Sequence, residues 1–170
     1  MEVSIFLLML MFSSYPVVVD AFHERMVRCR VCQRSISHIW SRATNLRRKC
    51  KHIDHTDERC DFKNVHPWAI DQMVWGVCDA LPQTYQALHY DGEFDLILHE
   101  EPNHSEELAA LIRATCKKFL HEHHGVDDIG RVMLANLEVG KTTEVILKSL
   151  EKHFCSKPCS RHWEDGDDEF

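Results

Sequence analysis

The chain has 170 residues, of which 44% are hydrophobic, 28% are charged and 9% are aromatic, and its formal net charge is −7. This length indicates one domain with at most a short tail, and the apolar fraction excludes a chain that is disordered throughout. With only 6 glycines and 5 prolines, the chain is not typical of a turn-rich β-sandwich or barrel. The composition also excludes collagen, a coiled-coil rod and a polytopic membrane protein, but it indicates no reaction.

The first residues have the pattern of a secretory leader. Ile5–Phe12 is an unbroken apolar run that is too short to span a bilayer. Val17–Val19 and Ala21 then supply the small or β-branched residues that a signal peptidase reads. We therefore expect residues 1–21 to be a signal peptide that is cleaved after Ala21, although no Lys or Arg precedes the apolar run. The alternative is a buried N-terminal strand or helix.

All eight cysteines follow the expected cleavage site, at positions 29, 32, 50, 60, 78, 116, 155 and 159. An even number in a small exported chain is typical of a disulfide framework. One alternative is a redox pair of Cys29 and Cys32, but that motif needs a strand and a βαβ context, which the surrounding residues do not predict. The other alternative is a zinc site, whose spacing would fit no standard ligand pattern. Its ligands would be Cys50, His52, His55 and Cys60.

Apolar residues at steps of three and four predict amphipathic helices along most of the mature chain. In chain order these are Arg28–Lys49, a helix from Pro67 that ends or kinks at Pro82, a helix capped by Ser105 that stops near Gly125, and two shorter helices around 129–137 and 145–154. Residues 90–103 are interpreted as a loop with an apolar piece, Phe94–Leu98, of unassigned type. No strand alternation of useful length is found, so the predicted fold class is all-α with about five helices.

The helix pattern suggests how the cysteines pair. Cys29 and Cys32 are one turn apart on the first helix, so both can reach partners on one neighbouring element near the end of the chain. The middle two cysteines each lie in the apolar face of their own helix. The resulting scheme is Cys29–Cys159, Cys32–Cys155, Cys78–Cys116 and a local bridge Cys50–Cys60. Eight cysteines allow many other pairings, so this scheme is a hypothesis.

Three stretches resemble the canopy branch of the saposin-like proteins: residues 28–32 followed by Ile39 and Trp40, residues 113–120, and residues 154–160. The resemblance implies a saposin-like, disulfide-stapled helical bundle over residues 22–160. It further implies a non-enzymatic helper of protein folding in the lumen of the endoplasmic reticulum (ER). Such a helper binds ER chaperones and secretory client chains and assists their assembly and disulfide formation.

Two features depart from that family. Cys50 and Cys60 are additional to its six-cysteine pattern, which supports the local bridge. Residues 161–170 form an acidic tail that ends Asp167–Phe170, where ER residents of the family have a Lys-Asp-Glu-Leu-type tetrapeptide. The acidic pair is kept and the basic residue and Leu are missing. We therefore expect residence in the ER lumen, with secretion as the alternative.

Charge is distributed unevenly along the chain. Residues 25–51 contain nine basic residues and no acidic one, whereas the tail is strongly acidic. The two regions either neutralise one another, or the basic region docks on an acidic chaperone, or the tail holds Ca²⁺. Nucleic-acid binding is not expected in this compartment. The alternative functions are a secreted or lysosomal lipid- or membrane-binding saposin-like protein, and an oxidoreductase that uses Cys29 and Cys32.

Two further motifs contain polar residues. Asn103-His104-Ser105 is an N-glycosylation sequon in a predicted loop, so Asn103 is a candidate glycosylation site. Residues 121–124, His-Glu-His-His, lack the zincin spacing and are interpreted as a solvated helix end, with metal contact or pH sensing as alternatives. No catalytic triad or carboxylate pair can be argued from spacing. We therefore expect no enzymatic activity, no metal and no other cofactor.

Overall fold

The computed structural model describes residues 17–52, 57–61, 64–90, 92–138 and 142–160. In these residues the helices are α2 (Val17–Cys50), α3 (Pro67–Thr84), α4 (Glu106–Lys117), η1 (Lys118–His124, a π-helix), α5 (Val126–Glu138) and α6 (Thr143–Cys155). Two of the expected segments fall outside the described residues, namely the acidic tail and most of the leader. The all-α fold class with five α-helices is confirmed.

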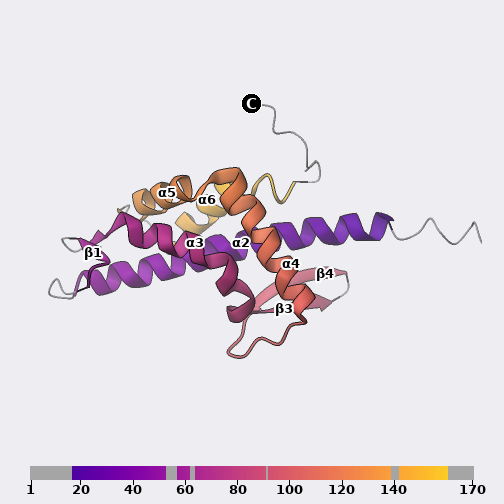
Figure 1. Cartoon of the computed structure of the whole chain (residues 1–170). Helices are drawn as coiled ribbons and strands as arrows, with labels where there is room; N and C mark the ends of the chain where they lie inside the picture. Colours follow the sequence, from indigo (N-terminus) through magenta and orange to yellow (C-terminus); the bar gives the residue numbers. More distant parts are fainter. Residues whose placement is uncertain (1–16, 53–56, 62–63, 91, 139–141, 161–170) are drawn as a thin grey trace, which may run out of the picture.

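The long helix α2 is the axis of the molecule, and the other elements pack along it (Figure 1). Its buried side chains recur at helical spacing, as at Val31, Ile36, Ile39, Ala43 and Leu46. This spacing places them on one face, which forms the centre of the hydrophobic core. The helix includes the predicted span 28–49 and begins earlier, at Val17, within the segment assigned to the leader.

The helix α3 begins at Pro67 as predicted, since a proline at the first helical position loses no intrahelical hydrogen bond. Pro82 does not end it, and the helix continues to Thr84. A proline in the last turn removes only its own N–H bond to the preceding turn. The next turn is still closed, because the N–H of Tyr85 donates to the carbonyl oxygen of Leu81.

The third predicted helix is confirmed as α4 followed directly by η1. Ser105 caps it by accepting a hydrogen bond from the N–H of Leu108 at 3.3 Å. Glu106 and Glu107 add the negative charge that the N-terminal end of a helix favours. The segment ends at Gly125, whose φ of 73° is readily adopted by glycine.

The interpretation of residues 90–103 as a loop is wrong for its first part, and the apolar piece Phe94–Leu98, whose type was left unassigned, lies in a strand. The strands β3 (Tyr85–Tyr90) and β4 (Glu93–Leu98) pair in antiparallel fashion, and Gly92 supplies a φ of 76° in the turn. Only Phe94 and Leu96 of β4 alternate as buried residues. That alternation is too short to be recognised in the sequence. A second, minimal hairpin pairs β1 (Cys60–Asp61) with β2 (Asn64–Val65).

Four disulfides cross-link these elements: Cys29–Cys159, Cys32–Cys155, Cys50–Cys60 and Cys78–Cys116. They join the same residues as the pairing scheme. The first two join Cys159 and Cys155, the last residue of α6, to α2, and the last joins α3 to α4. Because Cys50 and Cys60 are bonded to each other, neither thiolate is available to the zinc site considered above. Cys29 and Cys32 each bond to a different partner, which the redox-pair alternative does not predict.

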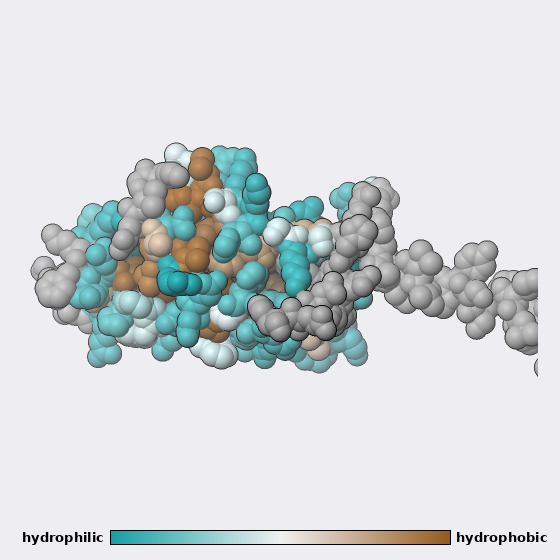
Figure 2. Space-filling view, turned by 90° about the horizontal axis from the view of Figure 1, so that it is seen from above, coloured by the Kyte–Doolittle hydropathy of each residue, from teal (hydrophilic) through white to brown (hydrophobic). Residues whose placement is uncertain are grey.

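Some apolar side chains remain at the surface. Viewed from above, they form a patch on the face of the molecule that carries α5 and α6 (Figure 2). Val145, on α6, is 56% exposed. None of the described helices combines the length and the apolar character that crossing a membrane requires.

Candidate functional site

A groove of about 540 Å³ opens between three elements: the first part of α2, the hairpin β3–β4 and one face of α4. We call it the apolar groove. Its lining residues are Glu24 and Val27 of α2, Ala87, Leu88 and His89 of β3, Phe94 of β4, and Leu108, Leu111 and Thr115 of α4. Most of these side chains are apolar, and the polar ones come from three different elements. The groove therefore has the composition of a binding site for an apolar group.

Buried and exposed apolar side chains alternate in the groove. Val27 and Phe94 are only 7% and 5% exposed. Leu88 and Leu111 are 44% and 46% exposed. Covering such surface contributes about 25 cal/mol per Å² of apolar area removed from water. A partner that fills the groove would therefore gain free energy from contacts that the isolated chain leaves exposed to solvent.

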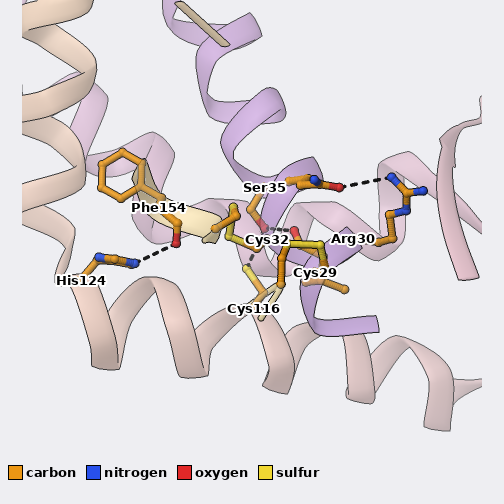
Figure 3. Close-up of a disulfide and its surroundings, with 11 residues drawn as sticks. Cys29, Arg30, Cys32, Ser35, Cys116, His124 and Phe154 are labelled. Atoms are coloured by element: carbon orange, nitrogen blue, oxygen red, sulfur yellow. Dashed lines mark hydrogen bonds between the residues drawn. A yellow bond between two sulfur atoms is a disulfide. The ribbon is translucent and has the colours of Figure 1, made fainter. Parts of the chain in front are cut away.

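The wall formed by α4 is held in place by a disulfide. Leu108, Leu111 and Thr115 follow helical spacing and share one face of α4. One residue later, Cys116 bonds to Cys78 of α3 and is fully buried. Ser35 of α2 packs against this bridge, because its hydroxyl lies 3.4 Å from Cys116 Sγ while it donates to the carbonyl oxygen of Val31 at 2.7 Å (Figure 3).

Polar contacts position the hairpin wall. Asp95 of β4 accepts a hydrogen bond from Arg34 Nη2 at 3.2 Å and lies 4.0 Å from Arg30 Nε. The side chain of Gln86 accepts a hydrogen bond from the backbone N–H of Asn103 at 2.7 Å and donates to its carbonyl oxygen at 3.1 Å. Part of the basic region of α2 is therefore neutralised by the hairpin. The acidic tail, whose neutralisation of this region is one of the alternatives given above, lies outside the described residues.

The sequon residue Asn103 is exposed, on the segment between the hairpin and α4. Its backbone is held by Gln86, and the hydroxyl of Ser105 in the same sequon caps α4. Nothing in these contacts uses the side-chain amide of Asn103, to which a glycan would be attached. Glycosylation of Asn103 stays a prediction.

The interpretation of residues 121–124 as a solvated helix end is wrong for two of the histidines. His121 Nε2 donates to the carbonyl oxygen of Val74 on α3 at 3.3 Å, and His124 Nε2 donates to that of Phe154 on α6 at 3.0 Å (Figure 3 shows the second). The wide turns of the π-helix direct residues three apart toward different neighbours. Among the described residues, no group of three or more His, Cys, Asp or Glu could hold a metal ion.

Two half-buried histidines make the stability depend on pH. Burial lowers the pKa of His124, and the hydrogen bond to Phe154 opposes this change without reversing it. The charges of His153 and His123 lower the pKa slightly further, whereas that of Asp128 raises it. Burial and then the charge of Arg42 lower the pKa of His38. The unfolded chain therefore binds more protons than the folded chain near the ordinary histidine pKa of about 6.5. We expect the free energy of unfolding to fall as the pH drops from about 7.5 to 5.5.

Urea unfolding at several pH values measures this effect. Replacing both histidines, as His38→Gln with His124→Gln, should flatten the dependence in that window because glutamine does not titrate. Carboxyl groups with raised pKa values, such as the partly buried Glu151, act in the opposite direction, because there the folded chain binds more protons than the unfolded chain. An unchanged slope in the double variant would contradict the assignment to these two histidines.

The cysteine pairs expected from the sequence are those of the structure, whereas the sequence did not indicate the apolar groove. Leu111 lies in the helix predicted to begin at Ser105, and Phe94 lies in the piece of unassigned type. No sequence signal distinguishes an apolar residue that faces a groove from one that faces the core. No family model matches the chain, and no curated protein or solved structure matches it.

Proposed function

We propose that the chain is a folding helper of the secretory pathway that holds apolar segments of client proteins in the apolar groove. It would act in the ER lumen, with ER chaperones and secretory clients as partners, assisting assembly and disulfide formation. The observation that carries the proposal is a groove with exposed Leu88 and Leu111 on a frame cross-linked by four disulfides. The resemblance to the canopy branch of the saposin-like proteins supports the compartment and the partners.

The architecture supports binding in two ways. The Cys78–Cys116 disulfide at α4 and the polar contacts of the hairpin hold the walls of the groove without a bound partner, so that little ordering is required when a client enters. The groove also crosses several elements, so an entering side chain contacts α2, the hairpin and α4 together. A site of this kind selects for apolar character and not for a particular sequence, which suits a protein with many clients.

Suppression of client aggregation tests the proposal. Citrate synthase unfolded in guanidinium is diluted into buffer with the full chain, and light scattering records aggregation without any reductant. Leu111→Asp places a charge in the groove at a position that is already 46% exposed. We expect this variant to need about tenfold more protein for the same suppression, because it loses the burial of roughly one leucine-sized apolar contact.

Val145→Asp is the matched control, since Val145 is also an exposed apolar residue on a helix but lies outside the groove. Circular dichroism should show both variants folded. Leu88→Asp changes the opposite wall and should reproduce the loss seen with Leu111→Asp. Equal suppression by Leu111→Asp and the unchanged chain would refute the proposed site.

The same apolar lining supports a second candidate function, the binding of lipid acyl chains. Sedimentation with vesicles of anionic phospholipid at pH 5 distinguishes the two. The folding-helper proposal expects little chain in the vesicle pellet. Strong sedimentation that Leu111→Asp abolishes would assign the groove to lipid instead.

A further inference from the structure

A second surface lies at the open end of the hairpin, away from its turn, and the proposed function does not use it. A crevice of about 430 Å³ separates α2 from the first residues of β3 and the last residues of β4. One wall, which we call the basic stripe, consists of Arg34, Ser37, His38, Ser41 and Arg42. Their spacing of three and four residues brings them onto one face of α2.

The two arginines of the basic stripe differ in their pairing. Arg34 is bonded to the carboxylate of Asp95 at 3.2 Å. Arg42, at the other end, is exposed, and no ion pair joins it to another described residue. His38 lies between them, and its lowered pKa leaves the ring neutral at pH 7. The uncompensated charge of the stripe is therefore the guanidinium of Arg42, with serine hydroxyls beside it that can donate hydrogen bonds.

The opposite wall of the crevice is apolar. Leu98 and Ile97, at the end of β4, are 73% and 38% exposed. Tyr85 is 8% exposed, and its ring meets the ring of His38 edge-on, with 5.9 Å between the ring centroids. Two adjacent exposed apolar side chains that line the same crevice as an arginine form a surface that an apolar group can contact.

We infer that this crevice binds an acidic peptide segment of a partner protein, in which a carboxylate is followed closely by an apolar residue. The carboxylate pairs with Arg42 and accepts hydrogen bonds from the serine hydroxyls. The apolar residue covers Leu98 and Ile97. Charge complementarity selects the acidic segment, and the apolar wall excludes ligands that consist of charge alone. The surface is separate from the apolar groove, so it can operate whether or not the groove binds clients.

Fluorescence anisotropy with the full chain tests this inference. The probe is a labelled peptide, Ser-Glu-Asp-Phe-Ser-Gly, and two comparison peptides carry Lys-Lys in place of Glu-Asp or Ser in place of Phe. We expect the first peptide to bind and both comparison peptides to bind at least about tenfold more weakly. Arg42→Glu should weaken binding by about tenfold or more, and Leu98→Ser should also weaken it.

Arg48→Glu is the matched control, because Arg48 is an exposed arginine of the same helix outside the crevice. Equal weakening by Arg42→Glu and Arg48→Glu would overturn the inference in favour of unspecific charge attraction. If Leu98→Ser leaves binding unchanged, the inference of an apolar contact at this site is wrong. Binding that strengthens in Asp167→Asn with Asp168→Asn would assign the crevice to the chain's own acidic residues and not to a partner.

Discussion

Removing either Cys29–Cys159 or Cys32–Cys155 should lower the free energy of unfolding by about 2.5 kcal/mol, whereas removing both should lower it by about 7 kcal/mol. The two bridges close almost the same loop, with sequence separations of 130 and 123 residues. Whichever bridge remains still restricts the unfolded chain. The bridge that is removed then closes only the short segments between the two cysteine pairs.

Urea unfolding without reductant measures these losses in the pairwise alanine variants Cys29→Ala with Cys159→Ala, and Cys32→Ala with Cys155→Ala. If the two loops acted independently, each pair would instead cost about 5 kcal/mol. A loss of that size in either variant would contradict the redundancy of the two bridges. The comparison holds even if the chain without both bridges fails to fold, because the two single-bridge losses already distinguish the models.

Phe154→Ala should lower the free energy of unfolding by about 3 to 5 kcal/mol, because it opens a cavity in the core beside a disulfide. Phe154 is fully buried, and its ring meets the rings of His124 and His153 edge-on, with centroid distances of 5.2 and 4.7 Å. It also precedes Cys155, which attaches α6 to α2. The bond from His124 uses the backbone oxygen of Phe154, so it survives the substitution.

Thermal and urea unfolding with all disulfides intact measure this loss. Val145→Ala on the same helix is the control, since an exposed side chain contributes within about 0.5 kcal/mol. A loss below about 1 kcal/mol in Phe154→Ala would mean that the disulfides alone hold α6 in place. The contact of α6 with the core would then be incidental to its stability.

The helices could be predicted because their signals are local. The steps of three and four residues along α2 and α4, and the cap at Ser105, depend only on neighbours within one or two turns. The same periodicity suggested the cysteine pairs, since Cys29 and Cys32 share a face of one helix. The effect of Pro82 could not be decided from local signals, because a proline is compatible either with the end of a helix or with its last turn.

The amino-acid sequence by itself determined the helical class and the pattern of residues that face the core. Only the tertiary structure decided where the remaining apolar residues lie. The hairpin is defined by pairing between strands and by contacts such as Asp95 with Arg34, which join positions far apart in the chain. The groove at Leu111 and the crevice at Arg42 exist because the hairpin leaves space beside α4 and α2. The local periodicity of the sequence does not indicate such spaces, since they depend on how elements far apart in the chain pack together.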